Sequence, residues 1–476
     1  MKRILTLVLF FILFAIANPQ NNRGDLDAYL TEYFKVKEIP SISAGVASEG
    51  KIIWLGARGY SDIENSVYAT TNTVYRIASI SKSITAVAIM QLVETGKINL
   101  DEDARKYLPY FPQKKWRFTT RQLLNHTAGI RTYRSGEFDS KEFFESTRDA
   151  VEYIIKDSLE YEPGTKYLYT TLGYNLLAGI IEYVSGLTLI DYYKTYIFSP
   201  VEMYSTTIEV QSEIIPNRAR GYIKDDFRKI KNAPLADLSI KYSGGGVVSN
   251  AGDLLKFGIN LSNGKLLSQN YLDSMLVPSK LKNGTVLSYG LGFLVGSDDN
   301  GKYFMHTGGG TGFTSQLIIY PNSKLAAVHL INIRDRNLDL PAKALASIAL
   351  KKEFIRPIKS LADRMLSVFL NSNADSALAI YQIIQKDSAD FYDVNFNELN
   401  LFGSDLIKIN RLTDAIRYFR FLTRLFPEEP KAFLGLAEAY NKDKNKGLAL
   451  RNYKFVLKLD SKNKQAAEMV KKLQTE

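Results

Sequence analysis

The rest of the chain can be interpreted from the stretch Arg76-Ile77-Ala78-Ser79-Ile80-Ser81-Lys82-Ser83-Ile84-Thr85-Ala86-Val87-Ala88-Ile89-Met90-Gln91-Leu92-Val93. Its apolar spacing predicts a buried helix that starts at Ser79 and stops at Gly96. Lys82 lies one helical turn after Ser79, so both side chains share one face. A serine hydroxyl becomes a nucleophile when a base removes its proton, and a lysine with a depressed pKa can be that base. Taken alone, Ser-x-x-Lys also fits an N-capping serine beside a solvated lysine.

The composition narrows the chemistry that the chain can perform. Its 476 residues are 45% apolar, which suggests two or three domains. Cysteine is absent, which excludes disulfides, thiolate metal sites and a catalytic thiol. The three histidines, His126, His306 and His329, are too dispersed to predict a metal site, so we expect neither metal nor cofactor.

The N-terminus has the pattern of a targeting segment. Lys2 and Arg3 precede an apolar run from Ile4 to Ala17, which closes with Ala15-Ile16-Ala17. A basic start, a short apolar core and a small-x-small ending are typical of a cleavable secretory signal. The run is shorter than the roughly 20 residues that span a bilayer. We therefore expect residues 1–17 to be a signal peptide and the protein to be exported, either periplasmic or secreted. An uncleaved N-terminal anchor is the alternative.

The formal net charge is +11, and residues 396–476 hold 16 Lys and Arg against 10 Asp and Glu. Such a charge allows association with an anionic cell-envelope surface, and an ordinary solvated basic surface explains it equally well. No nucleic-acid motif accompanies the charge, so we expect no nucleic-acid partner.

Strand patterns occur at both ends of the first part of the chain, up to about position 350, with helical patterns between them. A helix is predicted over 25–37, and two strands, 41–47 and 51–57, are joined by Ser48-Glu49-Gly50 as a hairpin. Strand patterns return at 290–295, 314–320 and 325–332, whereas residues 97–240 are mainly helical. This arrangement predicts an α+β fold whose antiparallel sheet is built from both ends of the domain, with a helical insertion.

The last part of the chain is predicted to be all helical and carries an internal repeat. Ala415, Phe419 and Pro427 recur at a constant spacing as Ala449, Tyr453 and Ser461. A period of about 34 residues with small residues at fixed places resembles the tetratricopeptide repeat (TPR). We expect repeats at 396–429 and 430–463 with a capping helix after them, and a helical linker or degenerate repeat at 353–395. An incidental helical tail is the alternative.

Two further segments give the Ser79–Lys82 pair its meaning. The first is Pro163-Gly164-Thr165-Lys166-Tyr167-Leu168-Tyr169-Thr170-Thr171-Leu172-Gly173-Tyr174-Asn175, and the second is His306-Thr307-Gly308-Gly309-Gly310-Thr311-Gly312, placed immediately before a strand. With Ser79-x-x-Lys82 they resemble the three motifs of the serine β-lactamase and penicillin-binding-protein superfamily, in its class C β-lactamase-like branch. The resemblance covers roughly residues 25–350. It implies a hydrolase domain over 18–352 with the β-lactamase/DD-peptidase-like fold.

The resemblance also implies roles for individual residues. Ser79 would form an acyl-enzyme, with Lys82 and Tyr169 sharing the proton transfers; which of the two is the first base stays open. The backbone N–H groups of Ser79 and Gly309 would form an oxyanion hole. Substrate-lining roles would fall to His306, Thr307, Gly308 and Thr171. His126 is interpreted as a structural residue that ties down a loop, and His329 as core or edge packing.

Two departures from the β-lactamase pattern bear on the substrate. Thr171 stands where class C enzymes have an asparagine, and His306 stands where they have a lysine. A largely neutral histidine should weaken recognition of a penicillin carboxylate. We therefore expect a peptidase or esterase acting on a small peptide or ester. A true β-lactamase or D,D-peptidase is the alternative within this class. The alternative from another class is a non-catalytic scaffold that binds a protein partner through 396–476.

Overall fold

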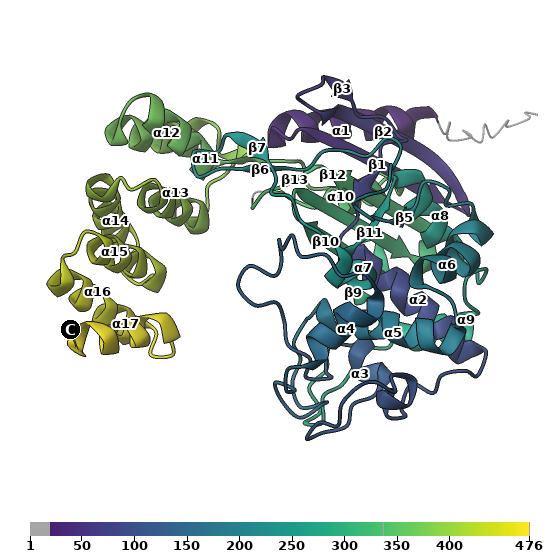
Figure 1. Ribbon diagram of the computed structural model, residues 1–476. Helices are drawn as coiled ribbons and strands as arrows, with labels where there is room; N and C mark the ends of the chain where they lie inside the picture. The colour runs from purple at the N-terminus through teal and green to yellow at the C-terminus, as the bar shows by residue number, and fades with distance from the viewer. Residues whose placement is uncertain (1–19, 337, 476) are drawn as a thin grey trace, which may run out of the picture.

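A seven-stranded antiparallel sheet is the centre of the larger part of the molecule (Figure 1). The computed structural model describes residues 20–336 and 338–475. The strand order is β3-β2-β1-β12-β11-β10-β9. The strands are β1 (Ser41–Ser48), β2 (Lys51–Asp62), β3 (Val67–Tyr68), β9 (Leu294–Asp298), β10 (Gly301–Gly310), β11 (Phe313–Tyr320) and β12 (Leu325–Ile331). Ile42 of β1 lies opposite Ile331 of β12, so both ends of this region meet in mid-sheet, as predicted.

The first hairpin has the predicted position, whereas the predicted strand 290–295 is wrong over most of its length. Glu49 and Gly50 both have positive φ, which matches the right-handed strand twist in a two-residue turn. The predicted strand 290–295 is mostly a turn, because Gly290 N donates to Phe293 O and Gly292 has φ +83°; β9 starts only at Leu294. The glycine motif 306–312 stands directly before β11, as predicted, and its residues 306–310 also belong to β10, a strand that the sequence did not indicate.

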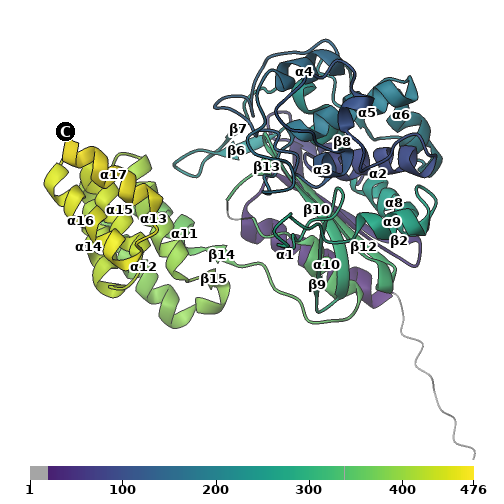
Figure 2. The ribbon, with the colours of Figure 1, turned by 90° about the horizontal axis from the view of Figure 1, so that it is seen from below.

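Helices cover both faces of the sheet (Figure 2). On one face, α1 (Gln20–Lys37) and α10 (Ala342–Ala349) enclose one apolar core with β1, β11 and β12. On the other face, α2 (Ile80–Glu94) and α8 (Ala251–Ser262) pack into a larger core shared with the inserted helices. Those inserted helices are α3 (Thr120–Leu124), α4 (Thr147–Ile155), α5 (Leu172–Ser185) and α6 (Leu189–Tyr193), followed by α7 (Tyr242–Gly245) and α9 (Gln269–Met275).

Short strands form two small sheets beside the large one, and a strand of the first leads into α2. The three-stranded sheet β4-β8-β5 consists of β4 (Tyr75–Arg76), β5 (Thr207–Ile208) and β8 (Val247–Ser249). A second small sheet, β13-β6-β7, consists of β6 (Tyr222–Lys224), β7 (Ile230–Asn232) and β13 (Ile333–Arg334). Because β4 leads directly to Ser79, its pairing with β8 fixes where α2 begins.

A helical module with its own apolar core follows the region of the large sheet. Its elements are β14 (Lys359–Ser360), α11 (Leu361–Asn371), α12 (Ala374–Asp387), β15 (Tyr392–Asp393), α13 (Phe396–Lys408), α14 (Leu412–Leu425), α15 (Pro430–Lys442), α16 (Lys446–Leu459) and α17 (Lys464–Thr475). The starts of α13, α15 and α17 follow one another at the predicted period, as do those of α14 and α16. The ring of Phe419 lies where a Cβ on Gly403 or Gly435 would have to sit, so both glycines let neighbouring helices close on one aromatic side chain.

Ion pairs fix the helical module to the region of the large sheet. Arg336, which follows β13, donates through both terminal nitrogens to Asp405 of α13, at 2.7 and 2.5 Å. Arg228, in the turn between β6 and β7, pairs with Asp335 and with Asp363 of α11. These partly buried ion pairs join the region of the large sheet to α11 and α13 of the helical module.

The predicted signal peptide, residues 1–17, lies outside the described residues. Within residues 20–336 and 338–475, no single helix is long and apolar enough to cross a membrane. One bent pair, Leu172–Ser185 with Leu189–Val201, has the length and composition, and much of it belongs to the core described above.

Candidate active site

Ser79 lies at the N-terminus of α2, directly after a strained residue. Ala78 has φ +46°, a region that residues with a side chain seldom adopt, and it turns the chain from β4 into the helix. Behind this turn, Ser315 of β11 donates to the carbonyl of Ile77 at 2.8 Å. This hydrogen bond holds the turn that precedes Ser79 against strand β11.

The predicted lysine is fully buried next to the predicted nucleophile. Lys82 is 0% exposed, and its Nζ lies 3.1 Å from Ser79 Oγ, 3.1 Å from Thr171 Oγ1 and 2.6 Å from Gly244 O. No carboxylate within the described ranges pairs with it. Burial first, and then the positive charge of Lys241, holds the pKa of Lys82 well below its usual value.

The same three contacts suit a neutral amine. Two N–H groups can donate to Gly244 O and Thr171 Oγ1, which leaves the lone pair facing the hydroxyl of Ser79. A neutral amine with its lone pair toward a serine hydroxyl is arranged to accept that proton.

Tyr169 lies over Lys82 and completes the predicted trio. The Nζ of Lys82 is 4.9 Å from the centre of the Tyr169 ring. Loss of solvation raises the pKa of Tyr169 above its usual value, and a hydrogen bond with Ser79 lowers it in part. The phenol therefore remains protonated at neutral pH, as a proton donor must.

His126 holds the Tyr169 segment in place, as predicted for a structural histidine. Its Nδ1 accepts from Thr170 N at 3.3 Å, its carbonyl accepts from Leu168 N at 3.0 Å, and its ring packs 4.3 Å from that of Tyr169. Burial lowers its pKa, so the imidazole stays neutral. His329, also as predicted, is fully buried within β12.

The glycines of the third motif allow β10 to pass close to Ser79. A Cβ on Gly308 would lie 2.3 Å from the carbonyl oxygen of Ile77 and 2.1 Å from Ser315 Oγ, whereas a Cβ on Gly309 would meet nothing within 4 Å. Gly309 lines a small cavity together with Ser79 and Thr171. The structure thus brings Ser79, Lys82, Tyr169, Thr171, Gly308 and Gly309 together.

His306 and Thr307 lie on β10 and do not line the cavity at Ser79, although the His306 ring is 6.2 Å from that of Tyr169. His306 is 3% exposed; its Nε2 is 3.0 Å from Tyr289 OH and its Nδ1 is 2.7 Å from Thr307 O. Burial and the nearby Lys82 lower its pKa to about 3, so the ring is neutral and both nitrogens are already engaged. A contact of His306 or Thr307 with a substrate carboxylate stays a prediction.

Several residues that line the cavity had no role in the sequence analysis. Arg76 and Thr311 stand in the quoted motifs, whereas Tyr133, Phe138, Leu238 and Lys241 had no signal in the sequence. Tyr133 also forms a hydrogen bond with Thr171. Lys241 directly precedes the glycine-rich helix α7, yet a single lysine there belongs to no pattern in a chain with 61 Lys and Arg.

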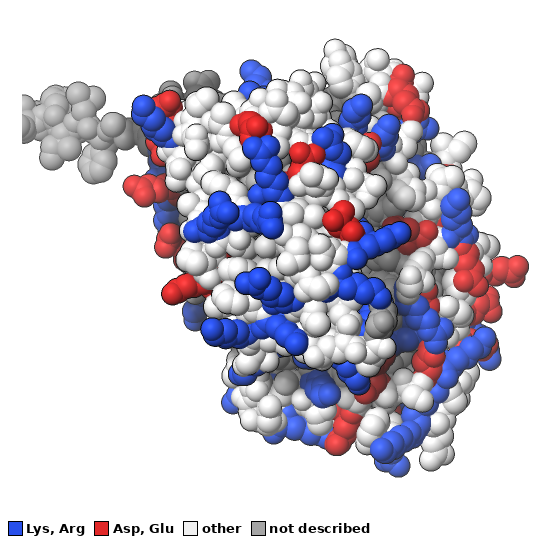
Figure 3. All heavy atoms as spheres, turned by 90° about the vertical axis from the view of Figure 1, so that its left-hand side faces the viewer, with Lys and Arg blue, Asp and Glu red and all other residues white. Residues whose placement is uncertain are grey.

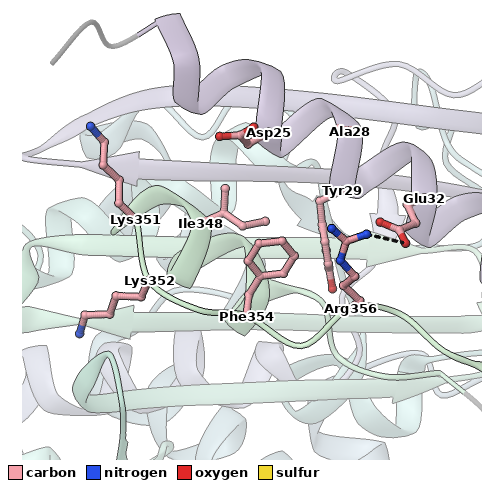
Figure 4. A pocket seen from close by; sticks show the side chains of 9 residues that line it. All are labelled: Asp25, Ala28, Tyr29, Glu32, Ile348, Lys351, Lys352, Phe354 and Arg356. Atoms are coloured by element: carbon pink, nitrogen blue, oxygen red, sulfur yellow. Dashed lines mark ion pairs between the residues drawn. The ribbon is translucent and has the colours of Figure 1, made fainter. Parts of the chain in front are cut away.

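A second cavity, of about 650 Å³, lies on the other face of the sheet, between α1 and the segment after α10 (Figure 4). Its floor is apolar, and its rim carries charges of both signs, including the pair Arg356–Glu32. Ser79, Lys82 and Tyr169 are absent from its lining. Within residues 20–336 and 338–475, no group of His, Asp and Glu could hold a metal ion.

A serine at a strained helix start, a buried lysine beside it and a tyrosine above both define the site of a serine hydrolase of the β-lactamase and penicillin-binding-protein class. Residues 26–350 match the family model described as Beta-lactamase, and the chain belongs to that family. Its architecture is the β-lactamase/DD-peptidase fold, as the motifs predicted.

Related proteins agree with this assignment. The chain is 30% identical over 452 residues to the mitochondrial serine beta-lactamase-like protein LACTB of Mus musculus, covering 74% of this chain and 78% of that protein. It is also 30% identical to penicillin-binding protein 4* of Bacillus subtilis, over 60% of this chain and 66% of that protein. Among solved structures, the octameric penicillin-binding protein homologue from Pyrococcus abyssi is 25% identical with a TM-score of 0.59, covering 72% of this chain and 81% of that one.

Proposed function

We propose that this protein hydrolyses amide or ester bonds through an acyl-enzyme on Ser79, as a peptidase or esterase without metal or cofactor. The observation that carries the proposal is the buried Lys82, which has no carboxylate partner in the described part of the chain and lies 3.1 Å from Ser79 Oγ. A lysine held this way is costly for the fold unless its neutral form is used.

In the acylation step, Lys82 Nζ accepts the Ser79 proton while Oγ forms a bond to the substrate carbonyl carbon. The N–H groups of Ser79 and Gly309 receive the developing oxyanion, where one donor contributes about 2.7–4 kcal/mol. The bond to the leaving amine or alcohol then breaks, and the leaving group takes a proton from Tyr169. The proton on Lys82 restores Tyr169, so the acyl-enzyme has both groups in their starting forms.

In the deacylation step, water adds to the acyl carbon and gives its proton to Lys82. The bond between Oγ and the acyl carbon breaks, Ser79 recovers a proton, and the carboxylic acid leaves. Thr171 supports both steps, because its hydroxyl accepts a hydrogen bond from Lys82 Nζ at 3.1 Å.

The peptidase or esterase assignment, over a β-lactamase, is supported by His306. A neutral, fully engaged imidazole replaces a permanent cation at the position that would face a β-lactam carboxylate. A D-amino acid amidase from Ochrobactrum anthropi SV3 shares the fold, with a TM-score of 0.59 at 23% identity over 70% of this chain and 98% of that one.

We further propose export by residues 1–17 and a TPR-like adaptor role for the helical module. Figure 3, viewed from the side of that module, shows Lys and Arg over much of this face, with fewer Asp and Glu. This supports contact with an acidic partner or an anionic envelope surface. N-terminal sequencing of the mature protein tests cleavage after Ala17.

The decisive experiment is intact mass after treatment with an alkyl fluorophosphonate. We expect one adduct on the wild type and on Ser83→Ala, whose hydroxyl is one turn along the same helix and donates to Gly292 O. Ser79→Ala should remain unlabelled. A folded wild type without an adduct would refute the hydrolase proposal and leave the scaffold hypothesis, in which only the helical module acts.

A further inference from the structure

The wall of the cavity at Ser79 contains a second buried lysine. Lys241 ends the short 3-10 segment Ser239–Lys241, is 5% exposed and lines the same cavity as Ser79. Its ammonium group donates to the backbone carbonyl of Phe138 and lies 4.4 Å from the Phe138 ring and 5.5 Å from the Tyr133 ring. The cavity around it is small, about 20 Å³, which is roughly the room for one water molecule.

The charge of Lys241 is not neutralised by an ion pair. Among residues 20–336 and 338–475, no carboxylate lies within 4.0 Å of its ammonium group. The two acids whose charges act on Lys241 bind other groups, since Asp139 accepts from Thr311 Oγ1 and Asp237 accepts from Ser239 N. The other cation of this wall, Arg76, is held by a bidentate pair with Glu209 at 2.7 and 2.8 Å.

A neutral carbonyl is a poor partner for a buried cation. A carboxylate in the same place would accept the same hydrogen bond and would add the attraction between two opposite charges, which is stronger away from bulk water. The Phe138 carbonyl therefore occupies the position that an anionic ligand would fill better.

The position of Lys241 indicates which half of the substrate, the acyl half or the leaving group, would lie near it. Tyr169 gives a proton to the leaving group, so the leaving group lies on the Tyr169 side of Ser79. Tyr169 does not line the cavity that contains Lys241. The acyl half of the substrate therefore extends toward Lys241.

We propose that Lys241 binds an anionic group, such as a carboxylate, carried by the acyl half of the substrate, so that the enzyme prefers acyl groups with a negatively charged end. This inference rests on the proposed acyl-enzyme mechanism. On binding, the carboxylate takes the place of the Phe138 carbonyl on the ammonium group, and the Phe138 segment moves to admit the acyl chain.

Alkyl fluorophosphonates test the inference, because phosphorus takes the place of the acyl carbon. Ser79 Oγ forms a bond to phosphorus, fluoride leaves, and the serine proton passes to Lys82. The probes carry either a carboxylate or a carboxamide at the end of chains of three to six carbons, so that each pair differs only in charge. The measurement is the second-order rate constant of labelling by intact mass.

For at least one chain length, we expect the wild type to react ten times faster or more with the carboxylate than with the carboxamide. Lys241→Met should bring the ratio of the two rates to about one, and Lys241→Glu should invert it. Lys97→Met removes an equal charge from an exposed position outside this cavity and should keep the wild-type ratio. If Lys241→Met does not fold, Lys241→Gln, which retains a donor for the Phe138 carbonyl, takes its place.

Two negative results separate the inference from the function on which it rests. If the wild type reacts with both members of every pair at equal rates, or if Lys241→Met keeps the preference, Lys241 is not the anion receptor while the hydrolase proposal stands. If neither probe labels the folded wild type, both proposals fail.

Discussion

In the proposed catalytic region, which is residues 26–350 of the family match, Ser79 is surrounded by side chains from distant parts of the chain, whereas in the helical module most contacts join helices that are neighbours in sequence. Lys82 touches Thr171 and Gly244, which follow it by 89 and 162 residues. Phe419, by contrast, lies against glycines of the helices directly before and after its own. The arrangement of side chains around Ser79 therefore depends on the whole sheet and on the helices inserted in it. The packing of the helical module depends on a local sequence pattern that repeats at a constant interval.

The largest effect is expected from Lys82→Met, which breaks the catalytic geometry alone. Without the proton acceptor, kcat/KM for a fluorogenic ester should fall by about 10²–10⁴-fold. Loss of the hydrogen bond to Gly244 O should cost about 1–3 kcal/mol of stability. The helical module should keep its own unfolding transition. Activity within tenfold of the wild type, on folded protein, would remove Lys82 from the mechanism.

The pH profile of the wild type is a second test of Lys82 as the base. The base must be neutral, and burial with the nearby Lys241 lowers the pKa of Lys82, so kcat/KM should rise with pH and reach its plateau well below 10.5. Tyr169 must stay protonated and its pKa is raised, so no fall is expected until above pH 10. A rising limb centred near the ordinary lysine pKa would contradict the assignment of Lys82 as the base.

The next largest effect is expected from Gly308→Ala, with Gly309→Ala as its matched control. A methyl group on Gly308 would meet the Ile77 carbonyl at 2.3 Å, and backbone there cannot retreat without moving Ser79. We expect a loss of activity of about 10²-fold, because a misplacement near 1 Å has that cost. Gly309→Ala has open space and should fold like the wild type. Equal behaviour of the two variants would show that the close approach of β10 is not needed.

The motifs of the catalytic region could be predicted because each of them lies within a short, continuous stretch of sequence. Ser79, Lys82 and Tyr169 each stand in a local pattern, and the structure brings them together. The strand β10 could not be predicted, because three successive glycines have low strand propensity and only pairing with β11 makes them extended. Lys241 was missed for a related reason: its place beside Ser79 follows from the path of a long insertion, which leaves no local pattern.

The helical module was more accessible to prediction. Its period fixed the repeats at 396 and 430, and the helices α13 and α15 begin at those residues. The segment before it was less clear, since α11 and α12 form a helical pair whose starts, Leu361 and Ala374, do not fall one full period before those of α13 and α14. Such a helical pair can still pack against the next repeat, because each repeat contacts only its neighbours. The spacing of residues in the sequence does not show that contact.

A smaller effect is expected from Gly435→Val, which breaks the module and spares the catalytic region. Its Cβ would lie 2.2 Å from the Phe419 ring, so α14 and α15 must separate. Overpacking of this kind costs about 1–3 kcal/mol. Thermal unfolding should show the module melting earlier, with kcat/KM on the ester unchanged. The matched control is Gly447→Ala in α16, which has open space and should stabilise the module by about 0.4–1 kcal/mol. A parallel loss of activity in Gly435→Val would mean that the module supports the active site.

The smallest effect is expected from His329→Leu, which separates the two regions by their response to acid. Burial lowers the pKa of His329 to about 3, so the folded state keeps it neutral while the unfolded state protonates near pH 6.5. Stability from this residue is therefore present above pH 6.5 and is lost as the pH falls toward 3, by at most about 1.4 kcal/mol per pH unit.

Denaturant unfolding at several pH values measures this difference. The leucine variant should lose less stability than the wild type below pH 6.5, although His126 and His306 still contribute to the decline in both proteins. All three histidines precede residue 361, so the unfolding of the helical module should show no change between the two proteins. Stability curves that run parallel from pH 7 to pH 4 would mean that His329 is protonated, or solvated, in the folded state. In that case the centre of the sheet, where β12 pairs with β1 and β11, would be open to water.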